Sequence, residues 1–156
     1  MKKNLLLVLF IAVVTQFSFA QKNQENLLDL TDARIENCTL EEGKTVISYS
    51  HSGKIYIPLE NYEGIKGFVL NYTNFEKLGD ANNSVGSINV IYTDEDGNEK
   101  KASWGFFRKG KKNVYFDAFE IDSKKTTVEI DPSLIKEVYL GIGKNKKVDI
   151  TVGLIK

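Results

Sequence analysis

The 156-residue sequence is poor in the residues that cross-link proteins or bind metals. Its single cysteine, Cys38, has no partner within the chain, so a disulfide framework is excluded and the core must hold the fold. A lone cysteine is more commonly a small buried hydrophobe than a reactive thiol. The single histidine, His51, has no neighbouring Cys, Asp or Glu at the spacing of a zinc site. The sequence therefore gives no support to a zinc or redox centre.

An excess of charge of one sign is also lacking. The chain has 21 Lys and Arg residues against 21 Asp and Glu residues. Without Lys2 and Lys3, which belong to the segment described next, the balance is (21 − 2) − 21 = −2. A nearly neutral chain creates no strong field around itself. We therefore expect neither nucleic acid nor an anionic membrane surface as a partner.

Long apolar runs are absent except at the N-terminus. There, two lysines precede the apolar run Leu5–Val14, and Ser18 and Ala20 follow it as the small residues of a cleavage site before Gln21. This order is typical of a secretory signal peptide. The run is too short to span a bilayer, which takes about 20 residues.

The domain boundaries follow from this N-terminal pattern. We predict a signal peptide over residues 1–20, a disordered or weakly ordered leader over 21–30, and a single domain over 31–156. The protein is then exported, to the periplasm or the medium, and the mature chain has no membrane span.

The helical period is almost absent from the rest of the chain, and alternation of apolar and polar residues takes its place. It is clear in Lys44–Ser50, Gly64–Thr73 and Gly86–Thr93. Asp-Gly within Asp94–Asn98, between two alternating runs, predicts a tight hairpin. About ten short strands joined by turns favour an all-β fold of two packed antiparallel sheets.

Three segments carry a resemblance to a known family. They are "KIYIPLENYEGIKGFVLNYT", "INVIYTDEDGNEKKAS" and "VEIDPSLIKEVYLGIG". Together they resemble the galactose-binding-like β-jelly-rolls of Bacteroidetes, which often serve as carbohydrate-binding modules of secreted or surface proteins. The resemblance implies a jelly-roll sandwich and a carbohydrate partner. It also leaves open a structural calcium ion, which such jelly-rolls often carry; no other cofactor is expected.

The stretch "KASWGFFRKGKKNVYFDAFE" holds the only tryptophan, Trp104. Alternation puts Trp104 on one face with Ala102 and Phe106, and this more apolar set is the simpler choice for the core. An exposed Trp104 would instead offer a flat ring to a sugar. Both interpretations stay open.

We read the same stretch as a β-hairpin with the basic run Arg108–Lys112 at its turn. The core set on its second strand is Val114, Phe116 and Ala118. Tyr115 and Asp117 then point outward, where a ring and a carboxylate suit a sugar. The candidate ligand-binding residues are therefore Trp104, Tyr115, Arg108 and Asp117, and Asn89 is a further hydrogen-bonding group.

No motif for catalysis stands out. The sequence has no Gly-x-Ser-x-Gly elbow, and Cys38 with His51 forms only a conceivable nucleophile pair. We therefore expect a non-catalytic binding domain, most simply one for carbohydrate. The alternative is a structural or interaction domain whose sheet docks on another exported protein.

Overall fold

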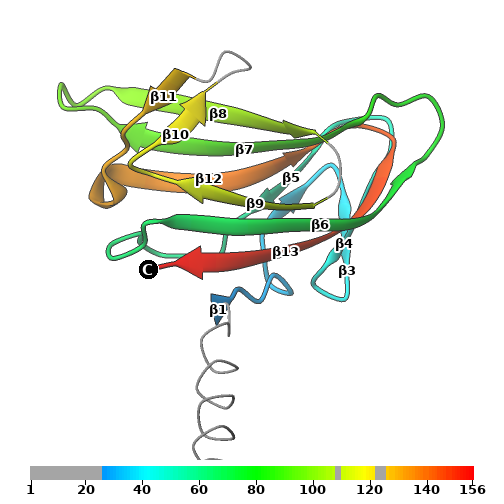
Figure 1. Ribbon diagram of the computed structural model, residues 1–156. Coiled ribbons are helices and arrows are strands. Elements are labelled where there is room, and N and C mark those ends of the chain that lie inside the picture. The colour runs from blue at the N-terminus through cyan, green and yellow to red at the C-terminus, as the bar shows by residue number, and fades with distance from the viewer. Residues whose placement is uncertain (1–25, 108–109, 122–125) are drawn as a thin grey trace, which may run out of the picture.

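The computed structural model describes residues 26–107, 110–121 and 126–156, and these residues form two stacked antiparallel sheets (Figure 1). The first sheet has the order β3 (Thr39–Glu41), β4 (Thr45–Ser48), β13 (Lys146–Ile155), β6 (Gly67–Lys77) and β9 (Gly110–Tyr115), with β1 (Asn26–Leu27) also paired to β13. The second has the order β2 (Ile35–Glu36), β5 (Gly53–Tyr56), β12 (Ile135–Ile142), β7 (Ser84–Thr93) and β8 (Glu99–Phe107). A separate ribbon pairs β10 (Phe119–Ile121) with β11 (Thr126–Val128), and the short 3-10 turn η2 (Pro132–Leu134) precedes β12.

The strand order is that of a jelly roll. Eight strands carry it, which in chain order are β4, β5, β6, β7, β8, β9, β12 and β13. Numbered one to eight, they form one sheet in the order 1-8-3-6 and the other in the order 2-7-4-5. This interleaving of consecutive strands between two sheets is the double Greek key of the jelly roll. The predicted fold class, an antiparallel jelly-roll sandwich, is therefore confirmed.

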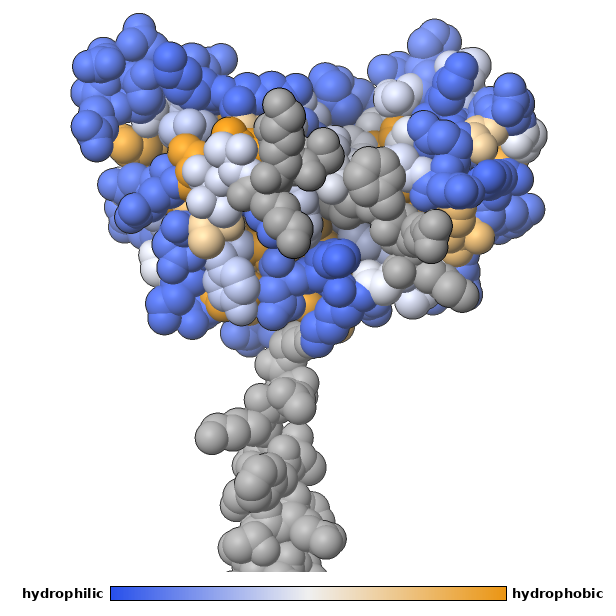
Figure 2. Space-filling view, turned by 45° about the horizontal axis from the view of Figure 1, so that its top comes forward, coloured by the Kyte–Doolittle hydropathy of each residue, from blue (hydrophilic) through white to orange (hydrophobic). Residues whose placement is uncertain are grey.

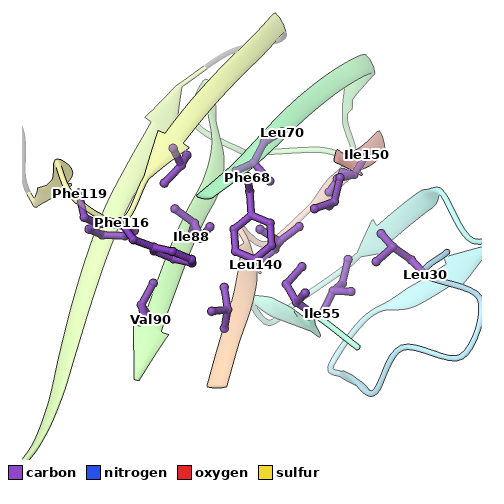
Figure 3. Packing of buried hydrophobic residues seen from close by; sticks show 14 of the residues in the cluster. Leu30, Ile55, Phe68, Leu70, Ile88, Val90, Phe116, Phe119, Leu140 and Ile150 are labelled. Atoms are coloured by element: carbon purple, nitrogen blue, oxygen red, sulfur yellow. The ribbon is translucent and has the colours of Figure 1, made fainter. Parts of the chain in front are cut away.

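The core lies between the two sheets and is made by alternate residues of each long strand (Figure 3). Phe68, Leu70 and Tyr72 of β6 point inward, as the alternation predicts. The Phe68 ring meets the Phe116 ring edge-on at 5.5 Å between centroids, and the Tyr62 ring at 6.4 Å. Edge-to-face pairs of this kind add to the free energy of burying each ring.

The hairpin predicted at Asp94–Asn98 is present between β7 and β8. The backbone N–H of Asp94 donates to the Asn98 carbonyl at 2.9 Å, and the Asp94 carboxylate accepts from the backbone N–H of Asp96 and Asn98. Gly97 has a φ of 80°, which glycine adopts without strain. The Asp-Gly pair in the sequence was therefore sufficient to predict this hairpin.

The second predicted hairpin is wrong. β8 and β9 do not pair, because β8 lies at the edge of the five-stranded sheet while β9 pairs with β6 in the other sheet. The connection between them therefore crosses from one sheet to the other, and part of the basic run, from Gly110 onward, is already strand. Arg108 lies outside the described residues.

The predicted core set of the following strand is correct for Val114 and Phe116 and wrong for Ala118. β9 ends at Tyr115, and the chain then turns at Asp117 and Ala118. This turn breaks the alternation, so that Ala118 is exposed and Phe119 is buried instead.

The first described residues pack on the domain. β1 pairs with β13, and Leu30 is buried in the core. The segment predicted as a leader, 21–30, thus overlaps these ordered residues. Its first part and the predicted signal peptide, 1–20, lie outside the described residues.

Stability should fall in acid because of Asp149 on β13. Its carboxylate accepts hydrogen bonds of 2.6 Å from the Thr45 hydroxyl and the Asn74 amide, and these bonds hold its pKa below the ordinary value of 3.8. A carboxyl group whose pKa is lowered by folding stabilises the fold above its unfolded pKa and loses that contribution as the pH falls through the folded pKa. We therefore expect the melting temperature to drop below about pH 4.

Thermal melts of the protein and of Asp149→Asn between pH 6 and pH 2.5 test this. The asparagine variant should be less stable at pH 6 and should lose less stability on acidification. Equal losses in the two proteins would contradict a role for Asp149.

Candidate functional site

Two of the predicted ligand-binding residues, Trp104 and Tyr115, lie at the edge of the sandwich where the β10–β11 ribbon packs beside β8 and β9. They line a hollow of about 270 Å³ between the edge strands β8 and β9. Its polar lining comes from Asn113, Glu120 and Thr127. We name this hollow, with those five residues, the edge hollow.

The Trp104 side chain is neither fully buried nor exposed. It lies on the core side of β8, next to the buried Ala102, and packs against the core with part of its ring accessible. Tyr115 is 41% exposed on the other strand, and its hydroxyl accepts a hydrogen bond of 3.3 Å from the Asn113 amide. An indole edge, a phenol ring and several polar groups therefore converge in the edge hollow.

Asp117 lies elsewhere. It lines a second hollow of about 420 Å³ with Lys66, Glu129 and Asp131. The structure thus brings Trp104 and Tyr115 together and leaves Asp117 out.

The outer face of the five-stranded sheet holds a group of side chains that the sequence analysis did not bring together. The inward residues of β12, Val138, Leu140 and Ile142, are buried, so Tyr139 and Gly141 face outward. Tyr139 pairs with Tyr56 of β5 on one side and with Asn89 of β7 on the other. Asn89 in turn pairs with Ser103 of β8.

These pairings form a row across four strands, Tyr56, Tyr139, Asn89 and Ser103, which we name the tyrosine row. The neighbouring row in the same register contains Lys54, Gly141, Ser87 and Gly105. Two of its members are glycines and a third is serine, so little side-chain bulk stands beside the tyrosine row. A side chain at position 141 would meet the Ser87 hydroxyl at 2.9 Å from its Cβ, so the site favours glycine.

The aromatic end of the tyrosine row is held by ring–ring and cation–π contacts. The rings of Tyr56 and Tyr139 lie 5.4 Å apart at 42°. The Arg34 guanidinium covers the Tyr56 ring at 3.5 Å, and Lys101 lies 5.4 Å from the Tyr139 ring. Cation–π contacts of this kind contribute about 0.5–1 kcal/mol each at exposed sites.

Charged groups around the two rings are held by ion pairs. The Glu36 carboxylate accepts from Lys54 at 2.8 Å and from the Tyr56 hydroxyl at 2.7 Å. These bonds lower the pKa of Glu36 and raise the pKa of Lys54. Arg34 pairs with Glu137 at 2.6 Å. Arg34 and Lys54 are therefore each paired with a carboxylate, and Lys101 adds a positive charge beside Tyr139.

Asn89 is 4% exposed, although it lies on the outer side of the sheet. Its amide nitrogen donates to the Ser87 hydroxyl at 3.0 Å, and its amide oxygen accepts from the Ser103 hydroxyl at 2.7 Å. These bonds fix the orientation of both serine hydroxyls beside the tyrosine row. Asn89, which the sequence suggested as a hydrogen-bonding group, is thus bonded to Ser87 and Ser103.

Tyr56 and Tyr139 were not among the site residues predicted from the sequence. Alternation in "KEVYLGIG" does place Tyr139 opposite the apolar set. The alternation gives no indication that Tyr56, far away in the chain, is the neighbour of Tyr139. The signal available was an aromatic residue at a solvent-facing position, next to a glycine two residues later.

The described residues do not support a metal or nucleophile site. Among them, no three His, Cys, Asp or Glu side chains are grouped so that they could hold a metal ion. Cys38 is half-buried, and burial raises the pKa of its thiol, which disfavours the reactive thiolate. Across 26–107, 110–121 and 126–156 there is also no helix with the length and hydropathy needed to cross a bilayer.

Comparison with known proteins gives matches at the level of structure alone. No model of a known protein family matches the chain, and no curated protein matches its sequence. The chain is similar to the family 11 carbohydrate-binding module of the cellulosomal cellulase Lic26A-Cel5E of Clostridium thermocellum, with a TM-score of 0.47 and 10% identity over 84% of this chain and 94% of that one. It is also similar to part of the agarase AgWH50C, with a TM-score of 0.40 and 9% identity over 85% of this chain and 25% of the agarase. The jelly-roll assignment itself rests on the strand order given above.

Proposed function

We propose that the protein is an exported, non-catalytic domain that binds carbohydrate on the outer face of its five-stranded sheet. The observation that carries this proposal is the tyrosine row, in which a pair of tilted aromatic rings in contact is followed by hydrogen-bonded Asn89 and Ser103. Export to the periplasm or the medium rests on the signal peptide expected at residues 1–20.

The chemistry of the row suits a sugar. The apolar face of a pyranose ring packs on an aromatic ring, and its hydroxyls need both donors and acceptors around the rim. Tyr139 supplies the ring, while Ser103, Ser87 and Lys101 supply polar groups next to it. Because Glu36 and Glu137 neutralise the nearby Lys54 and Arg34, the face favours a neutral saccharide.

Rigidity supports affinity. Side chains held in place before binding lose less conformational entropy when the ligand arrives. The Glu36–Lys54 ion pair, the hydrogen bond from the Tyr56 hydroxyl to Glu36 and the hydrogen bonds of Asn89 already hold this face in one arrangement. We therefore expect no large rearrangement on binding.

The edge hollow is a second candidate site for the same function, proposed from Trp104, Tyr115 and its polar lining. The two sites are separable, because Trp104 is the only tryptophan in the sequence. A ligand in the edge hollow should shift the emission maximum of Trp104 during a fluorescence titration. A ligand on the tyrosine row should bind, as measured by calorimetry, with the emission maximum unchanged.

Docking on another exported protein is the alternative function. Such a role predicts a wide apolar patch. The face seen in Figure 2 is largely hydrophilic, with small and separate apolar areas. The large apolar side chains exposed among the described residues, which are Leu27, Ile35, Tyr49, Tyr115 and Leu134, are distributed over different elements. These observations favour the carbohydrate partner.

A calorimetric screen tests the proposal. We expect the protein to bind at least one neutral polysaccharide of a panel that contains β-glucans, galactans, mannans and xylans. Acidic polysaccharides complete the panel. Binding to none of them, by a protein that melts cooperatively, would overturn the proposed function.

A further inference from the structure

A lysine occupies a core position at one end of the sandwich. Lys146 takes the first inward position of β13, in line with Val148 and Ile150, and it is 2% exposed. A buried ammonium group costs free energy unless it is paired. None of the carboxylates in the described residues lies within ion-pair distance of it: the acceptors found for its ammonium are the Asn82 side-chain oxygen at 3.2 Å and the Lys144 carbonyl at 3.3 Å.

The ammonium lines a polar pocket of about 420 Å³ where three connections meet. Ser52 comes from the β4–β5 connection, Asp80 and Asn82 from the β6–β7 connection, and Gly143 and Lys144 from the β12–β13 connection. We name it the loop pocket. An ammonium has three N–H donors, and Lys146 uses two of them on neutral oxygens, so one is left for a ligand.

The walls of the loop pocket are fixed by hydrogen bonds between connections. Backbone N–H of Asn145 donates to Tyr49 O at 2.7 Å, and Leu78 N–H donates to Asn145 O at 2.8 Å. The Asn82 side-chain oxygen also accepts from the Ser84 backbone at 3.1 Å. Gly143 leaves room for the Lys146 ammonium, which would lie 2.6 Å from a Cβ at that position and would have to move aside for one. The position of the charge is therefore set before any ligand binds.

The local charge is positive. Lys77 and Lys144 lie close enough to Lys146 to lower its pKa together with burial. The one acidic residue in the pocket lining, Asp80, is exposed and uses its backbone oxygen to accept from the Asn145 side chain at 3.3 Å. A preformed pocket with an ammonium paired only to neutral oxygens, flanked by two further lysines, suits an anion.

We propose that the loop pocket binds one oxyanion group, a carboxylate or a sulfate carried by an acidic saccharide, with Lys146 as its ionic partner. Asn82 positions Lys146, and Lys144 adds charge at the rim. This site is separate from the tyrosine row, which favours neutral sugar.

NMR titrations with small probes test the proposal without a polysaccharide. The probes are sodium glucuronate, inorganic sulfate and, as the neutral match, glucose. We expect glucuronate or sulfate to shift the amide signals of Asn82, Gly143 and Lys144 with saturation, while glucose leaves them in place. If glucuronate binds at least tenfold more tightly than sulfate, the group bound by the loop pocket is a carboxylate. If sulfate binds at least tenfold more tightly, that group is a sulfate. If neither anion shifts these signals, the proposal is overturned.

Variants connect the binding to the ammonium. Lys146→Met keeps the long apolar stem and should weaken the affinity for the anion at least tenfold. Lys44→Met removes an exposed charge elsewhere and should change that affinity less than twofold. Lys144→Met changes an exposed side chain, so the fold should be retained, and it should weaken the affinity for the anion about threefold. Unchanged affinity in both Lys146→Met and Lys144→Met would overturn the proposal.

Anion binding in the loop pocket can be tested independently of the proposed function. Tyr139→Ala should leave the glucuronate titration unchanged within twofold. Lys146→Met should leave the affinity for a neutral polysaccharide unchanged within twofold. Failure of one site is thereby distinguished from failure of the other.

Discussion

Tyr139→Ala should weaken binding of a neutral polysaccharide by about thirtyfold, which corresponds to about 2 kcal/mol, the range of a binding hot spot. The half-buried ring of Tyr139 is the member of the aromatic pair that Arg34 does not cover, and it stands between Tyr56 and Asn89 in the register. Removing it takes away the surface on which a sugar ring would pack. Isothermal titration calorimetry on the ligand found in the screen measures the change.

Two matched variants sharpen this result. Tyr139→Phe keeps the ring and should retain affinity within about threefold, because stacking depends on the ring more than on the hydroxyl. Tyr115→Ala removes an exposed tyrosine of the edge hollow and should leave the affinity unchanged. The opposite pattern, with loss in Tyr115→Ala and none in Tyr139→Ala, would move the site to the edge hollow.

Phe68→Ala should lower the free energy of unfolding by about 4 kcal/mol, as expected for deleting a buried aromatic ring. Phe68 is 0% exposed and lies between Tyr62 and Phe116, with both of which its ring makes edge-on contacts. These residues come from the β5–β6 connection, from β6 and from the turn after β9. Phe68→Ala would leave a cavity, and this cavity would loosen the contact between segments that are distant in the chain. The melting temperature should fall by on the order of 10 °C.

The control is Val69→Ala on the outer side of the same strand. Val69 is half-buried and faces away from the core, so its truncation should cost about 1 kcal/mol or less. Urea unfolding followed by circular dichroism measures both variants. Equal losses in Phe68→Ala and Val69→Ala would show that the contacts of the Phe68 ring do not hold the sheets together.

Much of the fold could be predicted from local patterns. Alternation along β6 identified Phe68, Leu70 and Tyr72 as inward residues, and Asp-Gly identified the β7–β8 hairpin. Both signals are local: side chains alternate with a period of two along any strand, and a tight turn depends on the conformation of two or three residues. Where the chain left a strand early, as after Tyr115, the same alternation assigned Ala118 and Phe119 to the wrong sides.

The candidate sites depend on which strands are neighbours in space, and no local sequence pattern indicates this. Trp104 and Tyr115 were predicted as ligand-binding residues, but as neighbours in a hairpin; they meet because β8 and β9 are the facing edges of two different sheets.

The sequence by itself determined that the chain is an antiparallel β-sandwich and which side of most long strands faces the core, although it left Trp104 open. The tertiary structure alone decided that Tyr56, Tyr139, Asn89 and Ser103 form one row, and that Lys146 lies in a pocket between three connections. The physical reason is that burial follows from the residue and its strand, whereas the lateral order of strands in a jelly roll is set by the packing of the whole core.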